Sequence, residues 1–388
     1  MPPPDAAGSL AGGIEGAAPT RRGAVRFVFI DALRGLAAIF VLVFHLFITF
    51  KDSPLFAHAP RLFRALVWRG YIGVYMFFVI SGFVIAYSIR EQRIDGRFLA
   101  RFALRRSIRL DPSYWAAIAA AALLVWKLHA STPSEYPQPS VKLILLHIAY
   151  LPEIFGYRYL LGVFWTLCVE VQLYITFVLL IGALQTVARW LPGAAHSDRS
   201  DLHGLGRIEW LLDVVLAVSG AVSACALASG FRTNGWLVEF WFAFALGALI
   251  CRAISQEAAR WALYLLLAVV LGCILICPDR DMRTPLAATL LTCLAIHVVA
   301  VAGGLTLWLR GPILQWLGRI SYSLYLWHMV AIPLLMIPAR SLIDRSIASS
   351  GLLFFACVGA SLALAQLMYW IVERPSLRLA MRIKARTT

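Results

Sequence analysis

Charged residues are scarce in this sequence, and their scarcity is the first guide to its class. Only 14% of the 388 residues are charged and 61% are hydrophobic, whereas a soluble domain is roughly a quarter charged and half apolar. A soluble core could not absorb this much apolar surface. The composition therefore argues against an ordinary globular domain and indicates a polytopic membrane protein.

Several familiar catalytic and binding motifs are also missing. There is no G-x-x-x-x-G-K-[ST] loop, no G-x-G-x-x-G, no G-x-S-x-G elbow and no H-E-x-x-H. His45 is followed by LFITFKD, so the H-x4-D pattern of soluble glycerolipid acyltransferases is absent too. The seven cysteines form no C-x-x-C pair and suit apolar filling positions better than a disulfide framework. These absences weigh against primary pumps and serine or zinc hydrolases, and no metal site is predicted.

The two ends of the chain differ from its middle. Residues 1–26 are rich in Pro, Gly and Ala and lack the apolar region of a signal peptide, so they predict a disordered cytoplasmic tail. Residues 376–388 predict a basic cytoplasmic tail. Between them, residues 27–375 form one predicted transmembrane domain, in which no internal repeat of the transporter kind is evident.

The apolar segments of this domain predict an all-α, polytopic membrane bundle of about ten helices. Spanning a bilayer takes about 20 mostly apolar residues. Ten segments qualify: 27–50, 71–89, 112–130, 160–187, 210–229, 235–251, 260–277, 285–305, 313–337 and 348–372.

The net charge of +15 does not require a nucleic-acid partner. Basic residues lie mainly in the connections between spans, where they set membrane orientation. Counted over alternate connections, 21 fall on the side that holds both termini and 11 on the other. We therefore expect both termini in the cytoplasm and no binding of nucleic acid.

Two strongly polar side chains lie within the first span. Arg34 and His45 are eleven residues apart in DALRGLAAIFVLVFHL, which on an α-helix is three turns plus about 20°. They share one stripe, roughly 16 Å apart along the axis, with Arg34 nearer the cytoplasm. An ion pair with a carboxylate would by itself explain Arg34, and a hydrogen bond to a carbonyl would by itself explain His45. Two such residues on one stripe favour a lined cavity, because polar groups in lipid are costly.

The connection from 90 to 111 contains seven arginines and no lysine. Orientation signals and a surface helix would explain a basic segment, but the spacing within RRSIR is more specific. Arg106 and Arg109, at i and i+3, can present two guanidinium groups to one multiply charged anion such as a phosphate. With Arg105, they are the predicted donor-binding residues.

The fourth span, WTLCVEVQLY, contains Trp165 and a single deep carboxylate, Glu170. Its expected depth matches that of His45, so Glu170 is a candidate to orient the imidazole as the third group of a catalytic triad does. An ion pair with Arg34 or another arginine is the alternative.

The ninth span, LGRISYSLYLWH, is unusually rich in hydroxyl groups. Tyr322, Tyr325 and His328 suit either hydrogen bonds between helices or the lining of a polar cavity. We expect a structural or substrate-lining role for them rather than a catalytic one.

Six motifs in one order resemble a known family. They are R-x10-H in the first span, FFVISGFVI in the second, RRSIRLDPSYW entering the third, WTLCVEVQLY, LGRISYSLYLWH and the closing YWIVERP. Over residues 27–375 the sequence resembles the integral-membrane acyltransferase-3 family. Its members include bacterial O-acetyltransferases of O-antigen, exopolysaccharide, nodulation factors and macrolides. The resemblance implies a multi-pass protein of the bacterial inner membrane.

The resemblance also implies an activity and a set of residues. The activity is transfer of an acyl group, usually acetyl from acetyl-CoA, to a carbohydrate hydroxyl, with no permanently bound cofactor. By position, the family motifs match the pair Arg34 and His45, the S-G-F residues Ser81, Gly82 and Phe83, and the R-x-x-R residues Arg106 and Arg109. We expect the S-G-F residues, together with Trp165, to line the cavity. Asp111 departs from the family pattern, which commonly has an apolar or aromatic residue there, and places a negative charge beside the arginines.

The residues and the resemblance lead to one mechanistic hypothesis. Arg106 and Arg109 bind the phosphates of a cytoplasmic acyl-CoA, and His45 acts as general base on a glycan or glycolipid hydroxyl. Arg34 holds either the thioester oxyanion or a donor phosphate. A covalent acyl-enzyme on Ser81 or a tyrosine is the variant mechanism.

Two other functions compete with acyl transfer. A proton-coupled secondary transporter or lipid-linked glycan flippase would use the same buried polar residues. A non-catalytic membrane scaffold would leave them without a purpose. The acceptor, the acyl chain and the oligomeric state are left open by the sequence.

Overall fold

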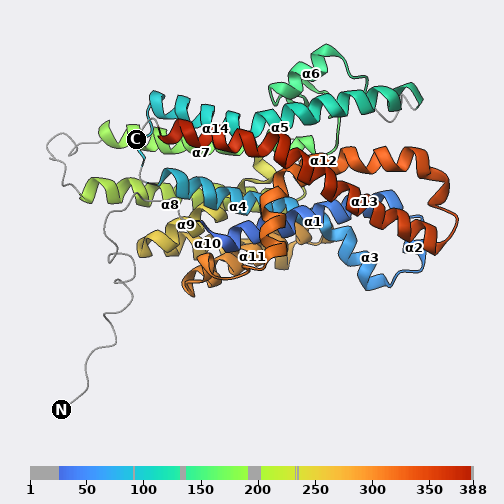
Figure 1. The fold of residues 1–388 in the computed structure, drawn as a ribbon. Helices are drawn as coiled ribbons and strands as arrows, with labels where there is room; N and C mark the ends of the chain where they lie inside the picture. The colour runs from blue at the N-terminus through green and yellow to red at the C-terminus, as the bar shows by residue number, and fades with distance from the viewer. Residues whose placement is uncertain are drawn as a thin grey trace.

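The computed structural model describes residues 26–90, 92–131, 137–190, 202–231, 233 and 236–385, and every regular element within them is a helix (Figure 1). All of the predicted disordered tail except Arg26, and the last three residues of the basic tail, lie outside the described residues. The longer helices are α1 (Val28–Phe50), α4 (Ile72–Ile89), α5 (Gly96–Ser131), α7 (Phe164–Trp190), α8 (Leu202–Ala228), α9 (Trp241–Ser255), α10 (Arg260–Ile276), α11 (Arg280–Val301), α12 (Pro312–Ala339), α13 (Ile347–Met368) and α14 (Arg374–Ala385). The shorter ones are α2 (Pro54–Ala57), α3 (Arg61–Trp68), η1 (Arg69–Tyr71), α6 (Val141–Ile148), η2 (Glu153–Phe155), η3 (Leu237–Glu239), η4 (Glu257–Ala259), η5 (Gly304–Thr306), η6 (Arg340–Leu342) and η7 (Tyr369–Glu373).

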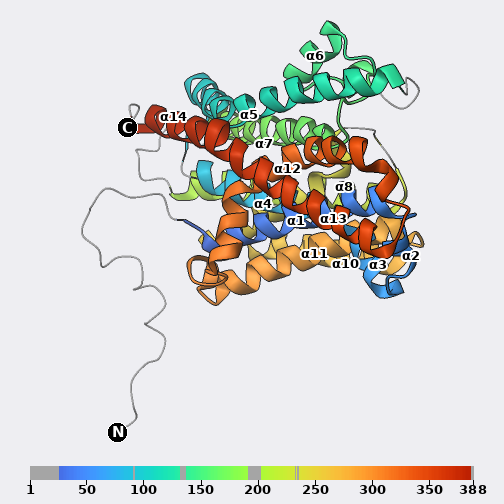
Figure 2. The ribbon, with the colours of Figure 1, turned by 45° about the vertical axis from the view of Figure 1, so that its right-hand side comes forward.

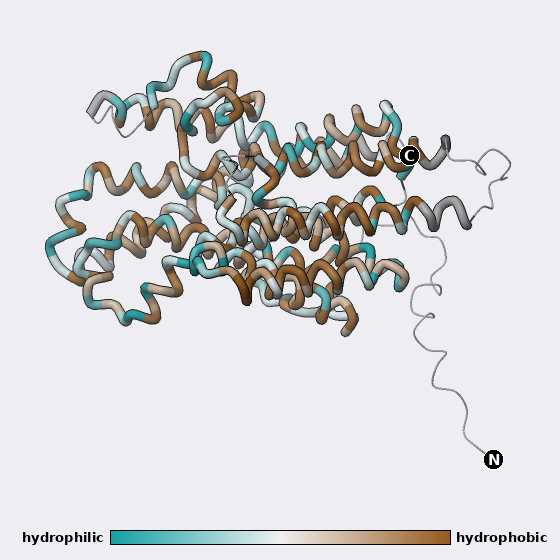
Figure 3. Tube along the Cα trace, turned by 180° about the vertical axis from the view of Figure 1, so that it is seen from behind, coloured by the Kyte–Doolittle hydropathy of each residue, from teal (hydrophilic) through white to brown (hydrophobic). Residues whose placement is uncertain are grey.

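The helices form a polytopic membrane bundle, as the sequence predicted. Nine helical segments in the described part of the chain are long and apolar enough to cross a bilayer. Hydrophobic residues cover most of the helix lengths, and hydrophilic ones gather in the connections at the two ends (Figure 3). The start of α1 and the end of α14 lie at one end, and α2, α3 and α6 lie toward the other (Figures 1 and 2).

The remaining predicted span, 235–251, corresponds to the shorter helix α9. Its 15 residues are fewer than a lipid-facing span needs. Every residue from Trp241 to Cys251 is buried, because α4, α8, α10 and α11 surround the helix. Its length is therefore not set by contact with lipid.

The arginine-rich segment is helical, and the expectation of a connection over residues 90–111 was wrong for most of it. Helix α5 runs without a break through Pro112, and its 36 residues extend about 54 Å. Apolar residues between the arginines pack against the core and hold this segment on the bundle: Phe98, Phe102 and Leu110. Arg106 and Arg109 are consequently carried into the bundle instead of lying in a loop, whereas Arg97 and Arg101, nearer the start of α5, are exposed.

Glycines set the close approach of the helices around the site. A Cβ at Gly82 on α4 would lie 2.0 Å from the carbonyl oxygen of Phe244 on α9, and one at Gly247 would lie 1.9 Å from that of Val79. Helices α1 and α12 meet in the same way at Gly318, where a Cβ would lie 2.2 Å from the Asp31 carbonyl oxygen. Small residues at such contacts are how membrane helices pack tightly without a hydrophobic driving force.

Candidate active site

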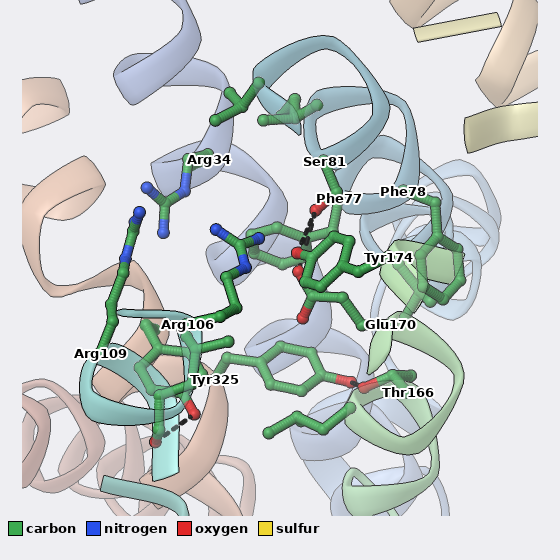
Figure 4. Close-up of a pocket in the computed structure, with 16 residues that line it drawn as sticks. Arg34, Phe77, Phe78, Ser81, Arg106, Arg109, Thr166, Glu170, Tyr174 and Tyr325 are labelled. Atoms are coloured by element: carbon green, nitrogen blue, oxygen red, sulfur yellow. Dashed lines mark hydrogen bonds between the residues drawn. The ribbon is translucent and has the colours of Figure 1, made fainter. Parts of the chain in front are cut away.

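A small cavity lies inside the bundle, at the level of the arginines. Its volume is about 90 Å³, and side chains from α1, α4, α5, α7 and α12 line it (Figure 4). Typical ligand pockets measure about 300–1,000 Å³. The cavity therefore admits a small group or a narrow chain, and a larger ligand would have to extend beyond it.

Three guanidinium groups face this cavity. Arg34 comes from α1, and Arg106 and Arg109 come from one face of α5 (Figure 4). Among the described residues none of the three forms an ion pair within 4.0 Å. The Arg106 side chain lies over the ring of Tyr174, with its Cζ 4.0 Å from the ring centroid, and its buried Nε has no hydrogen-bond partner. Positive charge in low dielectric without a counter-ion is costly, so the cavity is suited to an anion.

The opposite wall carries a hydrogen-bond network. The Ser81 hydroxyl donates to Glu170 Oε1 at 3.0 Å, and the Tyr174 hydroxyl donates to Ser81 Oγ at 3.2 Å. Glu170 interacts electrostatically with Arg106 across the cavity. Glu170 therefore accepts a hydrogen bond from Ser81 and interacts with the arginine side of the cavity. The expectation that it orients His45 was wrong.

Two further carboxylates flank the arginines. Asp111 accepts hydrogen bonds from Ser107 and, at 2.8 Å, from the Tyr150 hydroxyl, so its charge is engaged away from the cavity. Glu373 accepts from the Ser323 hydroxyl at 2.6 Å and interacts electrostatically with Arg34 and Arg109.

The sequence analysis did not identify Glu373 as a site residue, although it lies within the family motif YWIVERP. The signal was a lone carboxylate at the end of an apolar span. The π-helical turn η7 places this carboxylate in the bundle, where it is buried, and such turns are frequent at functional sites.

His45 is close to a second histidine rather than to a carboxylate. Its Nδ1 lies 3.2 Å from Nε2 of His328, and the ring centroids are 5.0 Å apart. Neither histidine lines the small cavity. Tyr325 connects the two places, because it lines the cavity and its ring centroid is 6.2 Å from that of His328. The histidine pair is therefore one aromatic ring away from the cavity.

The backbone contacts assign the protons of this pair. Nδ1 of His45 is 2.9 Å from the carbonyl oxygen of Val41, and Nδ1 of His328 is 2.9 Å from that of Leu324. A carbonyl only accepts, so both Nδ1 atoms carry a proton. The single Nδ1–H of His45 is then shared between the Val41 carbonyl oxygen and the lone pair of His328 Nε2, and His45 Nε2 keeps its own lone pair. That arrangement is the one a general base requires.

Of the remaining predicted residues, two line the small cavity and four do not. Tyr322 and Tyr325 line the small cavity; the Tyr322 hydroxyl donates to the Leu110 carbonyl at 3.0 Å, and that of Tyr325 lies 2.5 Å from the Thr166 hydroxyl. Contrary to expectation, Gly82 and Phe83 do not line it, because Gly82 packs on α9 and Phe83 is a core residue. Trp165 and Arg105 do not line it either.

Within the described residues, no three His, Cys, Asp or Glu side chains come together in a way that could hold a metal ion.

Comparison with known proteins is consistent with this arrangement. The family described as an acyltransferase domain matches residues 27–370. The putative membrane-bound transacylase BcsY of Komagataeibacter xylinus is 27% identical over 374 residues, covering 90% of this chain and 82% of the relative. Acyltransferase MdmB of Streptomyces mycarofaciens is 27% identical over 389 residues, covering 92% of each chain.

A shorter match is protein 2 in the picA locus of Rhizobium radiobacter, 30% identical over 114 residues, which covers 28% of this chain and 53% of that protein. No solved structure matches the chain significantly. The family match extends over nearly the whole membrane bundle and both walls of the cavity. This multi-pass membrane protein is an acyltransferase of the integral-membrane acyltransferase-3 family.

Proposed function

We propose that this acyltransferase moves an acyl group, usually acetyl, from a cytoplasmic acyl-CoA to a hydroxyl of a carbohydrate acceptor in the bacterial inner membrane. The observation that carries the proposal is the cavity whose three arginines form no ion pair within 4.0 Å among the described residues, next to a histidine pair in which His45 keeps a free Nε2.

The arginines would serve the donor. Arg106 and Arg109 lie on the long helix α5 and offer their guanidinium groups to the donor phosphates, through charge-assisted hydrogen bonds that are stronger than neutral ones. The 90 Å³ cavity suits a narrow pantetheine arm or an acetyl group better than a long acyl chain. Arg34, on α1 with His45, would face the thioester end or a donor phosphate.

His45 would supply the base. Its Nε2 takes the proton of the acceptor hydroxyl as that oxygen attacks the thioester carbonyl carbon. The tetrahedral oxyanion then collapses, the C–S bond breaks, and the proton on Nε2 passes to the leaving sulfur to give the free thiol of CoA. His328 accepts from Nδ1–H throughout and stabilises the positive charge that forms on the imidazole. Such a base contributes about 10²- to 10⁴-fold to rate.

The test is complementation of a deletion strain. Mass spectrometry of the surface glycans identifies the acyl mass that the deletion removes. Wild-type protein and a His58→Ala control should restore that mass, because His58 is an exposed histidine outside the site. His45→Ala should restore none of it while being inserted in the membrane at the wild-type level.

Full restoration by His45→Ala would overturn the role of His45. Purified protein with labelled acetyl-CoA and the extracted glycan then tests the reaction itself. A transporter or flippase would transfer no label.

A further inference from the structure

A second and larger cavity lies at the outer-loop end of the bundle, away from α14. Its volume is about 580 Å³, within the range of about 300–1,000 Å³ that small-molecule sites occupy. Six aromatic residues line it: Trp68, Tyr71, Tyr75, Tyr159, Trp165 and Phe240. They come from α3, η1, α4, α7 and the segments before α7 and α9, so three separate parts of the chain, around residues 68–75, 159–165 and 240, build one aromatic-walled pocket.

Carboxylates are prominent in the wall of this outer cavity. Glu153, Glu239 and Asp281 line it, and among the described residues no lysine, arginine or histidine does. Glu153 accepts a hydrogen bond from the Tyr159 hydroxyl at 2.8 Å. Ionised carboxylates only accept hydrogen bonds, so they favour ligands that donate and repel ligands that are anionic.

The outer cavity adjoins the small cavity of the arginines. Val74 lines both, and Trp165 in the outer cavity precedes Thr166 in the inner one. The ring of Phe240, in the outer cavity, is 5.1 Å from that of Phe78, which lines the inner cavity. A single layer of side chains therefore separates the two.

The outer cavity is also close to the histidine pair. The ring of Phe44 contacts that of His45 at 5.2 Å and those of Trp68 and Tyr71 at 5.7 and 5.6 Å. Trp68 and Tyr71 line the outer cavity, so Phe44 links His45 to the wall of the outer cavity, as His328 links it to Tyr325 in the wall of the inner one. A hydroxyl in the outer cavity and a thioester in the inner one would approach His45 from its two sides.

We propose that the outer cavity is the acceptor site and that it takes an uncharged, polyhydroxylated ligand, namely a neutral glycan segment. Aromatic rings offer flat apolar faces to the C–H faces of sugar rings, and the carboxylates accept from sugar hydroxyls. A uronic-acid, phosphorylated or sulfated glycan would place its negative charge against Glu153 and Asp281. This assignment rests on the proposed transfer to a hydroxyl and adds the location and charge of the acceptor.

The test uses binding, which needs no acyl donor. Purified full-length protein in nanodiscs is titrated with the neutral tetrasaccharides cellotetraose, maltotetraose, mannotetraose and chitotetraose, and separately with tetragalacturonate, while tryptophan fluorescence is followed. At least one neutral sugar should give a saturable change. Tetragalacturonate should bind at least ten-fold more weakly than that sugar.

Matched variants locate the signal. Trp165→Phe and Trp68→Phe should each reduce the fluorescence change, whereas Trp210→Phe should not, because Trp210 is an exposed residue of α8 outside the cavity. Glu153→Gln with Asp281→Asn should reduce the ratio between the Kd for tetragalacturonate and the Kd for the neutral sugar, since both carboxylates that repel the anionic sugar are then neutral amides.

The outcomes separate this inference from the proposed function. If no neutral sugar binds, if tetragalacturonate binds as well as they do, or if Trp210→Phe alone loses the signal, the acceptor assignment is overturned even where acetyl transfer occurs. If neutral sugars bind with the expected variant pattern but no labelled acetyl is transferred to any glycan, the sugar site stands and the transfer reaction fails.

Discussion

Arg106 provides the sharpest test of the donor cavity, through the variant Arg106→Met. Its guanidinium faces the cavity, has no ion-pair partner within 4.0 Å among the described residues, and has an unsatisfied, buried Nε. If it binds a donor phosphate, the variant loses a charge-assisted hydrogen bond of about 1.5–3 kcal/mol. At about 1.4 kcal/mol per tenfold, the Kd for acetyl-CoA should rise roughly 10- to 150-fold.

The ligand can be truncated as well as the protein. Acetyl-pantetheine keeps the thioester and lacks the nucleotide phosphates, so its Kd should change little in the Arg106→Met variant. Both constants are measured by isothermal titration calorimetry on protein in detergent. Arg101→Met is the matched control, since Arg101 is exposed on the same helix and does not line the cavity.

The structure also predicts the thermal stability of the Arg106→Met variant in the absence of the acyl donor. Arg109 is repelled by both Arg106 and Arg34, so removal of one charge relieves repulsion and should leave the apo protein at least as thermostable as wild type. An unchanged Kd for acetyl-CoA would refute the assignment to a phosphate. An equal loss for acetyl-pantetheine would assign Arg106 to the thioester end instead.

Three further predictions follow from contacts away from the arginines. His328→Ala should lower the acyl-transfer rate roughly 10- to 100-fold with unchanged Kd for acetyl-CoA, because the Nδ1–H of His45 loses one of its two acceptors and keeps only the Val41 carbonyl. His328→Gln should recover part of the rate, which a purely structural role would not predict. Burial lowers the pKa of His147, on helix α6, below its ordinary value of 6.5. The unfolded state then binds more protons, so the contribution of His147 to the free energy of unfolding should be fully present above about pH 6.5 and should fall as the pH drops toward the folded pKa. Limited proteolysis of this segment at pH 5 and 7.5 measures the change. A His147→Asn variant with the same pH dependence would contradict the prediction. Gly82→Ala places a Cβ 2.0 Å from the Phe244 carbonyl oxygen and should cost about 1–3 kcal/mol or more, seen as a lower melting temperature, whereas Gly272→Ala, with open space around it, should be neutral.

The polytopic helical fold was predictable because long apolar segments have few other solutions in a bilayer. Where the prediction differed from the structure, tertiary packing was the cause. Helix α9 could be short because other helices surround it, and the arginine segment could be helical because its apolar residues contact the core. Neither fact is visible in local composition, since both depend on neighbours far away in the chain.

The candidate site divides in the same way. Periodicity and motif order identified Arg34, His45, Arg106 and Arg109, because polar residues in apolar spans are costly and therefore conspicuous. The partners of these residues came only from the structure. Glu170 contacts Ser81, and His45 contacts His328, which is 283 residues away in the chain.

What the sequence determined by itself was thus the class of protein, the family motifs and the residues whose burial needs a reason. What only the tertiary structure decided was which of them face a common cavity, which histidine nitrogen is free, and that a second, acidic and aromatic cavity adjoins the first. The physical reason is that burial cost is a property of a residue in its own helix, whereas hydrogen bonding and cavity shape depend on how separate helices pack together.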